Sequence, residues 1–361
     1  MTSAATIMIT TGGTGGHVFP GLAVAAKLAA RGTRVFWLGT REGMEARLVP
    51  QHGVDFEALS FRGVRGKGPT TLLLGPLVLL AACFDAWKIL RRRAPDVVLG
   101  LGGFASFPGA LMSVAAGKAL VVHEANAVAG LANRVLAHGA DRILLGFPQA
   151  MKGAHAARVE WVGNPLRDAI CALPEPSLRF TGRGGALRLL VVGGSLGAQA
   201  LNERVPAALA TLSPDERPSV VHQAGERHVA ALRGTYNRHG VEADCVAFID
   251  DMAARYAWAD LVICRGGALT VAELAACGLG AIVVPLPGAI ADEQSANAQF
   301  LVDAGAALKE SQHALTPQRL AELLRTIDRP RARAMATAAY GLGKRDAADR
   351  VAEICLMLAR R

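Results

Sequence analysis

Residues Ile7–His17 read IMITTGGTGGH, and residues Leu189–Ala198, about half a chain later, read LLVVGGSLGA. Each stretch is an aliphatic run followed by Gly-Gly, then Thr or Ser, then another glycine, and each leads into a helix-like segment. Glycines let a strand turn sharply into a helix and let backbone N–H groups approach a ligand. The repeated pattern therefore predicts two similar halves, each built around a strand, a glycine corner and a helix.

Continuous aliphatic runs recur along both halves and are typical of parallel strands buried on both faces. The predicted strands are Thr6–Thr10, Val35–Leu38, Val97–Leu101, Leu120–Val122, Arg142–Leu145, Leu187–Val192, Val220–Gln223, Cys245–Phe248, Leu261–Cys264 and Ala281–Val284. The clearest predicted helices are Leu22–Ala30, Ala129–Leu136, Ala198–Leu212 and Leu269–Cys277. We predict an α/β protein with two Rossmann-like, doubly wound parallel-sheet domains that face each other across a cleft.

The composition excludes several classes of protein. The 361 residues are 52% hydrophobic, which provides an ample core and excludes a disordered chain. Aromatic residues make up only 5%, fewer than a stacking platform for single-stranded nucleic acid normally needs. Six cysteines without a C-x-x-C motif argue against a disulfide scaffold or a zinc ribbon and favour a reducing cytoplasm.

The positive charge lies mostly in the first half. Residues 1–164 carry 17 of the 39 basic residues but only 9 of the 30 acidic ones. This imbalance favours an acidic partner, namely nucleic acid, a phosphorylated substrate or an anionic membrane, although general solubility is the alternative. Residues 68–84 carry no charge and are flanked by basic residues. This stretch is expected either to lie on an anionic membrane surface or to pack as a buried helix. Residues 1–13 lack a basic n-region and a cleavage site, so we expect no signal peptide there.

The first glycine corner, Gly12–Gly16, matches neither the dinucleotide fingerprint nor the ATPase loop. At the start of a helix it would suit a phosphate or a developing anion, and a plain tight turn is the alternative. His17 ends this corner and is our candidate general base, with a structural role as the alternative and His123 as a second candidate. The histidine spacing predicts no metal site, and we expect no cofactor.

A second corner, Cys264–Glu273, reads CRGGALTVAE. Backbone N–H groups at this helix start could hold a diphosphate, and Glu273 one turn later could bind two ribose hydroxyls or simply complement the helix dipole. Gln294 and Asn297 have i,i+3 spacing and would suit sugar hydroxyls, unless they only begin a polar helix. A diphosphate site followed by a ribose site predicts a nucleotide-sugar ligand.

Longer motifs now make a family resemblance specific. They are GGTGGHVFPGLAVA from Gly12, the corner Gly102-Gly103-Phe104, HEAN from His123, VGNPLR from Val162, GGSLGAQALN from Gly193, FIDDMAARYAWAD from Phe248, CRGGALTVAE from Cys264 and DEQSANA from Asp292. Over nearly its whole length the chain resembles the MurG family, the UDP-N-acetylglucosamine–N-acetylmuramyl-(pentapeptide) pyrophosphoryl-undecaprenol N-acetylglucosamine transferases of peptidoglycan synthesis.

The resemblance implies an inverting GT-B glycosyltransferase that makes lipid II from lipid I at the cytoplasmic face of the inner membrane. It implies an acceptor and membrane-facing domain at 1–164, with a C-terminal helix at about 345–361 packing back on it, and a UDP-sugar domain at 165–344. The donor contacts that it implies are Thr14, Gly15, Gly16, Asn126, Arg167, Ser195, Ile249, Ala268, Leu269, Thr270, Val271, Ala272, Glu273 and Gln294. The implied partners are UDP-N-acetylglucosamine, lipid I and an anionic membrane surface, without nucleic acid.

The chain departs from the family pattern at two donor-side positions. Leu196 stands where the family usually has Gln, and Gly266 stands where it usually has Ser. Both departures remove a hydrogen-bonding side chain. These departures leave open a membrane-binding nucleotide-sugar module without catalysis. A second alternative is another GT-B enzyme that acts on the same donor, such as a UDP-sugar 2-epimerase or a different glycosyltransferase.

Overall fold

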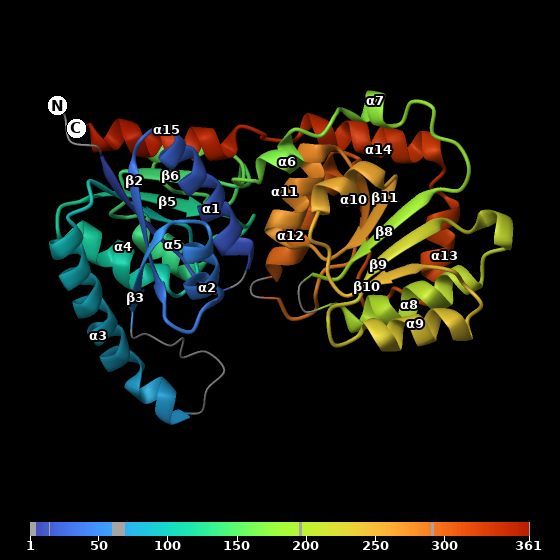
Figure 1. Cartoon of the computed structure of the whole chain (residues 1–361), viewed down its shortest axis with the longest axis horizontal. Helices are drawn as coiled ribbons and strands as arrows, with labels where there is room; N and C mark the ends of the chain where they lie inside the picture. The colour runs from blue at the N-terminus through green and yellow to red at the C-terminus, as the bar shows by residue number, and fades with distance from the viewer. Residues whose placement is uncertain (1–4, 14, 60–68, 195–196, 290–291, 361) are drawn as a thin grey trace. The chain divides into compact units, whose positions relative to one another are not determined.

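The computed structural model describes residues 5–13, 15–59, 69–194, 197–289 and 292–360, with only the backbone described for residues 69–74. The described chain forms two compact units, each with its own parallel sheet (Figure 1). Unit 1 comprises residues 1–167 and 345–361, and unit 2 comprises residues 168–344. The domain boundary expected after residue 164 lies a few residues before the division in the structure.

Unit 1 is a seven-stranded parallel sheet with the order β3-β2-β1-β4-β5-β6-β7. Its elements are β1 (Thr6–Thr10), α1 (Gly15–Ala30), β2 (Arg34–Thr40), α2 (Met44–Gln51), β3 (Asp55–Leu59), α3 (Pro69–Arg93), β4 (Val97–Gly100), α4 (Ser106–Ala115), β5 (Ala119–Glu124), α5 (Leu131–Leu136), β6 (Arg142–Leu145), η1 (Ala156–Arg158), β7 (Val159–Trp161) and α15 (Ala347–Ala359).

Unit 2 is a six-stranded parallel sheet with the order β10-β9-β8-β11-β12-β13. Its elements are α6 (Asp168–Cys171), α7 (Pro176–Arg179), β8 (Arg188–Val192), α8 (Gln199–Ala210), η2 (Pro214–Glu216), β9 (Ser219–Gln223), α9 (Val229–Arg238), β10 (Asp244–Val246), α10 (Met252–Trp258), β11 (Leu261–Cys264), α11 (Ala268–Cys277), β12 (Gly280–Val283), α12 (Glu293–Asp303), β13 (Ala307–Lys309), α13 (Pro317–Arg325) and α14 (Arg329–Gly341).

Both sheets reverse their strand order at one place, and this place positions the site. The chain winds outward from β1 through β2 to β3 and then returns to β4 beside β1, and it repeats this pattern from β8 to β11. Crossover connections diverge at such a switch point, which leaves room for a ligand beyond the carboxyl ends of the two strands. The predicted pair of doubly wound α/β domains is confirmed.

The strands that the sequence pattern missed lie at sheet edges. β3, β7 and β13 are each edge strands and carry charged residues such as Glu57, Glu160 and Lys309. An edge strand has one side without a neighbour, so its sequence need not be a continuous apolar run. A search for continuous aliphatic runs therefore finds the central strands and overlooks these three.

The last helix of the chain, α15, belongs to unit 1, where it lies beside α1 (Figure 1). Val351, Ile354 and Leu358 are buried in the same hydrophobic cluster as the inward residues of α1 and β1. Ion pairs fix the outer face, since Asp349 lies 3.0 Å from Lys27 and 2.9 Å from Arg31. The helix thus completes the cover on one face of the first sheet, although the whole of unit 2, residues 168–344, separates its segment from the rest of unit 1 in the sequence.

The long helix α3 covers residues 69–84 of the uncharged stretch, and its two faces differ in burial. Ala82, Ala86 and Leu90 are buried in the core of unit 1. Leu77, Leu80 and Phe84 are exposed to 64%, 65% and 55%. The helix therefore packs along one side and presents large apolar side chains to solvent along the other. No helix within the described ranges is long and apolar enough to span a membrane.

Candidate active site

Four glycine corners lie at the two switch points. They follow β1, β4, β8 and β11, which are the two central neighbouring strands of each sheet. In each unit, helix N-termini begin after these corners, as α1 does at Gly15 and α11 does at Ala268. Helix N-termini bring unpaired N–H groups and a partial positive charge to the same place. Each unit therefore carries one candidate site.

His17 lies in the first turn of α1, against the corner that follows β4. A Cβ added at Gly102 or at Gly103 would lie 3.6 Å from the imidazole, and both glycines have positive φ angles of 83° and 79°. The distance to the ring is an ordinary contact, and it is the positive φ angles that favour glycine at both positions. The helix starts earlier than the predicted Leu22, so that Gly15, Gly16 and His17 are part of it.

The electrostatics of His17 favour a neutral imidazole. Burial lowers the pKa of His17 below its usual 6.5, while the charge of Glu124 and a backbone hydrogen bond at Leu101 act in the opposite direction. Its Nδ1 is buried and has no hydrogen-bond partner in the described structure. An orphaned buried nitrogen is costly, and a bound hydroxyl could satisfy it. The side chain can accept a proton at neutral pH.

Glu124 organises the loop that follows β5. Its Oε1 accepts the backbone N–H of Asn126 at 2.9 Å, and its Oε2 accepts Gly130 N–H at 3.1 Å and Asn133 Nδ2–H at 2.8 Å. His123 is fully buried, and its Nε2 donates to the Gly163 carbonyl at 2.9 Å. Burial lowers the pKa of His123 to about 4. His123 is therefore less accessible to a substrate than His17, the other candidate base.

Unit 2 contains a pocket of about 670 Å³ at its switch point. It lies among the corners after β8 and β11 and the first turns of α8, α11 and α12. The lining residues are Val192, Gly193, Gly194, Gly197, Ala198, Gln199, Ala200, Glu203, Arg204, Arg265, Gly267, Thr270, Leu286, Gln294 and Gln312. Backbone groups, three amide side chains and two guanidinium groups dominate this wall, which suits an anionic, hydroxyl-rich ligand.

The two arginines of this pocket meet on one residue. Arg265 Nη2 donates to Gln312 Oε1 at 2.7 Å, and Arg204 donates to the Gln312 backbone carbonyl. Burial, and next the charge of Arg204, lowers the pKa of Arg265. Neither guanidinium forms an ion pair in the described part of the chain, although Glu203 also lines the pocket. Two like charges held close together without an acidic partner are arranged to receive an anion.

The first turn of α11 carries five of the predicted contacts, from Ala268 to Ala272. Val271 is buried, and the other four are half-buried. Glu273 is only 7% exposed, and its Oε2 accepts the Tyr256 hydroxyl at 3.0 Å. The contact of Glu273 with a ribose therefore stays a prediction, in which the carboxylate would exchange or share its Tyr256 partner.

The two amides of α12 have different roles. Gln294 lines the pocket, and its Oε1 accepts the backbone N–H of Leu286 at 2.9 Å. Asn297 is fully buried and donates to the Gly266 carbonyl at 3.0 Å, so it fixes a corner and does not face a sugar as the spacing had predicted. A Cβ at Gly266 would overlap the Gln294 carbonyl oxygen. Gly266 therefore allows α12 to approach the corner closely.

The remaining predicted contacts lie as follows. Thr14, Ser195 and the departure at Leu196 fall outside the described residues. The guanidinium of Arg167 lies 5.7 Å from the centre of the Phe19 ring, in unit 1. Ile249 is buried in the segment after β10, in unit 2. The described structure thus brings Thr270 and Gln294 together in one pocket, and all of the donor contacts stay predictions.

Sequence reasoning assigned no role to Arg204, Arg265 or Gln312. Arg265 directly follows a predicted strand within a quoted motif, which was a usable signal for a ligand contact. Arg204 lies on a helix that begins after a glycine corner, and Gln312 lies 108 residues further along the chain. The local pattern carried no signal for that long-range pair.

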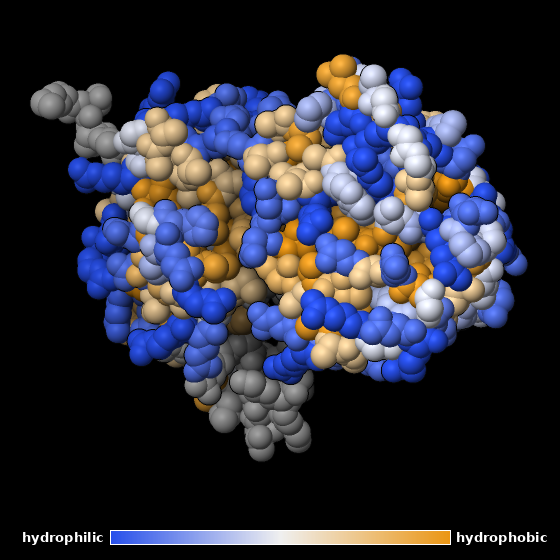
Figure 2. Space-filling model, turned by 45° about the vertical axis from the view of Figure 1, so that its right-hand side comes forward, coloured by the Kyte–Doolittle hydropathy of each residue, from blue (hydrophilic) through white to orange (hydrophobic). Residues whose placement is uncertain are grey.

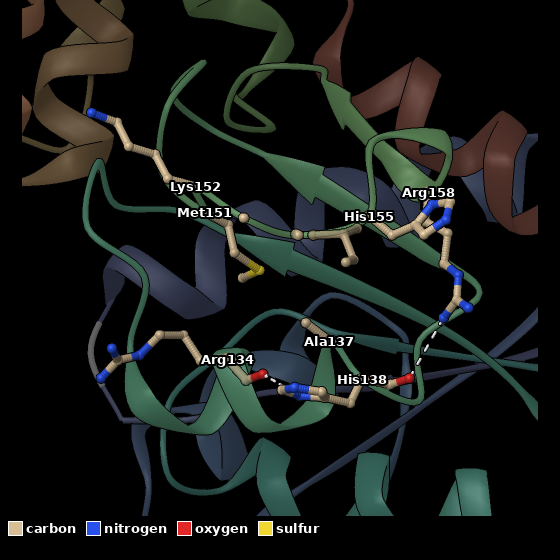
Figure 3. Close-up of a pocket in the computed structure, with 10 residues that line it drawn as sticks. Arg134, Ala137, His138, Met151, Lys152, His155 and Arg158 are labelled. Carbon is tan, nitrogen blue, oxygen red and sulfur yellow. Dashed lines mark hydrogen bonds between the residues drawn. The ribbon is translucent and has the colours of Figure 1, made fainter.

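A second cavity, of about 380 Å³, lies in unit 1 between α5 and the segment that follows β6 (Figure 3). Arg134, His138, Lys152, His155 and Arg158 line it together with apolar residues such as Met151, and no acidic residue does. The carbonyl groups at the end of α5 hold two of these side chains, since His138 Nδ1 donates to Arg134 and Arg158 donates to His138. This cavity adds to the positive surface of unit 1.

Two doubly wound units with glycine corners at their switch points define the GT-B class of nucleotide-sugar enzymes. Family models extend this likeness to the sequence. The model of the glycosyltransferase family 28 N-terminal domain matches residues 7–145, and that of the C-terminal domain matches residues 188–351. The chain belongs to glycosyltransferase family 28.

Relatives and a solved structure agree with this assignment. The UDP-N-acetylglucosamine–N-acetylmuramyl-(pentapeptide) pyrophosphoryl-undecaprenol N-acetylglucosamine transferase of Dechloromonas aromatica (strain RCB) is 53% identical over 98% of this chain and 99% of its own length. The enzyme of the same name from Bordetella pertussis is 54% identical over 99% of both chains. The crystal structure of Acinetobacter baumannii MurG is 36% identical, covers 98% of this chain and 99% of its own, and has a TM-score of 0.85.

Proposed function

We propose that the chain transfers N-acetylglucosamine from UDP-N-acetylglucosamine to the 4-hydroxyl of the muramoyl sugar of undecaprenyl-diphospho-muramoylpentapeptide, with inversion at the anomeric carbon. The observation that carries the proposal is identity above 50% along the whole chain to enzymes named for this transfer. The anion-suited pocket at the switch point of unit 2 supports it, because the donor is a nucleoside diphosphate linked to a sugar.

In this proposal unit 2 holds the donor. Arg204, Arg265 and the start of α11 would surround the diphosphate, and Thr270 and Gln294 would contact the sugar. Glu273 would bind the ribose. The diphosphate becomes a leaving group during transfer, and positive groups at the helix start would stabilise the charge that develops on it.

Unit 1 would hold the acceptor. The acceptor hydroxyl loses its proton to His17, its oxygen forms a bond to C1 of the donor sugar, and the bond between C1 and the diphosphate breaks as UDP leaves. The neutral form of His17 at neutral pH supports its role as base. Two of the predicted contacts, Gly15 and Gly16, directly precede His17 in α1. A third, Asn126, lies two residues after Glu124 and donates its backbone N–H to that carboxylate.

The surface of unit 1 suits an anionic membrane. Large apolar side chains are exposed on three neighbouring helices: Leu77, Leu80 and Phe84 on α3, Leu111 and Val114 on α4, and Leu131 and Val135 on α5. Lys88 and Arg91 stack on Phe84 and Trp87 of α3, and the basic cavity of Figure 3 adjoins α5. Apolar side chains bordered by cations are the composition that binds anionic lipid surfaces. We place the enzyme peripherally on the cytoplasmic face of the inner membrane.

Radiolabelled UDP-N-acetylglucosamine, incubated with and without lipid I, tests the proposal. Label that enters lipid only when lipid I is present supports it. Conversion of the sugar nucleotide without lipid I would instead indicate a 2-epimerase or another activity on the same donor. Binding without turnover would indicate a module that has lost catalysis.

A further inference from the structure

A buried carboxylate lies beneath the first glycine corner, and no function discussed so far uses it. Glu45 is in the first turn of α2 and is completely inaccessible to solvent. Its Oε1 accepts the Thr40 backbone N–H at 3.0 Å and the Thr40 hydroxyl at 2.7 Å. Its Oε2 accepts the Gly13 backbone N–H at 3.3 Å. The carboxylate thus joins the end of β2 to the corner that follows β1.

Three glycines make the space for this side chain. A Cβ at Gly12 or at Gly43 would overlap the Glu45 carboxyl group, and a Cβ at Gly39 would lie 2.6 Å from its Cγ. These glycines come from three different segments, before α1, within β2 and before α2. A side chain at any of the three positions would overlap Glu45 as it lies here, so each glycine leaves room for the buried carboxylate.

The charge of Glu45 is costly to bury, and no cation offsets it. No basic side chain forms an ion pair with it in the described structure. A buried carboxylate without a cation is stable only where hydrogen bonds and helix dipoles replace water. Of the three hydrogen bonds that Glu45 accepts from described residues, two come from Thr40 and would hold the side chain in place. The third comes from Gly13, whose φ of 107° only glycine adopts readily.

We propose that Glu45 is a positioning residue for transfer, which fixes the backbone of Gly13, four residues before His17 in the first turn of α1. The proposal rests on the function proposed above. Glu45 occupies the Gly13 N–H, so this corner does not offer that group to a phosphate. The bond to Glu45 would instead hold the Gly13 backbone in place close to the base in the sequence, and deprotonation of an acceptor hydroxyl requires a base held in position.

The test compares Glu45→Gln with Thr40→Val in the full-length chain. In Glu45→Gln the amide oxygen can keep both bonds to Thr40, but the amide nitrogen then faces the Gly13 N–H, and two donors cannot bond. Thr40→Val removes a bond of the same carboxylate and keeps the one to Gly13. Exposed Glu42→Gln is the control for loss of a negative charge nearby. We measure kcat with lipid I, the affinity for UDP and the melting temperature of each variant.

We expect Glu45→Gln to lower kcat at least tenfold, with the dissociation constant for UDP unchanged within twofold, because UDP would bind in unit 2. Thr40→Val should lower the melting temperature about as much as Glu45→Gln does, but it should keep kcat within threefold of the wild-type value. The proposal is overturned if Glu45→Gln keeps its kcat, if Thr40→Val loses kcat to the same extent, or if UDP affinity falls along with kcat. A wild-type chain without lipid-dependent transfer would instead refute the proposed function.

Discussion

At the scale of single residues, His17 gives the sharpest expectation. His17→Ala should lower kcat by about 10²- to 10⁴-fold, the usual range for loss of a general base, and should leave UDP affinity unchanged. His52→Ala, at an exposed histidine of the same unit, is the matched control. Full turnover by His17→Ala with saturating acceptor would show that another group takes the proton.

The pH dependence follows from the lowered pKa of His17. The base works in its neutral form, so the rate falls as the pH drops through the pKa of the folded enzyme. Burial holds that pKa below 6.5, and the acid limb of kcat/KM should therefore lie below 6.5 and not at it. The limb should vanish from the residual activity of His17→Ala. A limb above 6.5 would contradict this environment of the imidazole.

The arginine pair of unit 2 is expected to contribute to the affinity for UDP but not to the affinity for uridine. Arg204→Gln should weaken UDP binding by about 10- to 100-fold, because a charge-assisted hydrogen bond contributes about 1.5–3 kcal/mol. The affinity for uridine, which has no phosphate, should stay the same. Arg333→Gln, at an exposed position of α14, serves as the control. Isothermal titration calorimetry measures the affinities of the wild-type chain and of both variants for UDP and for uridine. Equal losses for UDP and uridine would remove Arg204 from the diphosphate site.

At the scale of elements, α15 is the part of unit 1 that the chain adds last. Ile354 is 1% exposed within the core of that unit, whereas Met357 on the same helix is 49% exposed. Ile354→Ala should lower the free energy of unfolding by about 2–5 kcal/mol, and Met357→Ala should change it by less than about 0.5 kcal/mol. Denaturant unfolding of the two variants compares them directly. Similar stabilities would mean that α15 does not pack as described.

The exposed face of α3 predicts membrane binding that depends on particular side chains. A double variant with Leu80→Gln and Phe84→Gln should lose most of its flotation with anionic liposomes while it keeps its melting temperature, because both side chains face solvent. Leu178→Gln, at an apolar residue of unit 2 that is 66% exposed, is the matched control. Flotation that is unchanged in the double variant would move the membrane surface elsewhere.

Sequence patterns predicted elements well where burial alone decides their composition. Central strands such as β1 and β11 are apolar along their whole length because helices cover both faces of the sheet. The edge strand β3 carries Asp55 and Glu57, which form ion pairs with Arg93 and Arg92 on α3. The partners of these ion pairs lie more than 30 residues away in the sequence, so the local hydrophobic pattern of the strand could not indicate them.

At the scale of the whole molecule, the repeated glycine corners made two units predictable, because each corner needs backbone that only glycine supplies. Of the candidate site, only the glycine corners and the helix starts that follow them were predictable from the sequence. Glu45 bonds to Gly13 across 32 residues, and the bond between Arg204 and Gln312 crosses 108. Asn297 shows the opposite failure, since its i,i+3 spacing with Gln294 holds but its side chain is buried. An i,i+3 spacing places two side chains on the same face of a helix, but tertiary packing determines whether that face contacts a ligand or the protein core.

Surface composition gives little further guidance at this scale. Figure 2 shows hydrophilic side chains over most of one face, with hydrophobic ones exposed among them, as on ordinary globular proteins. The features that favour a membrane surface are instead the large apolar residues exposed on three helices of unit 1 and the net positive charge of the first half. The proposed roles of the two units are best tested in one reaction.

That reaction is a time course with UDP-N-acetylglucosamine and lipid I, in which UDP release and the mass of the lipid product are measured together. The account predicts that each UDP released is matched by one lipid molecule that has gained a single N-acetylhexosamine. UDP released without a glycosylated lipid, or a lipid whose mass never changes while the sugar nucleotide is consumed, would contradict it.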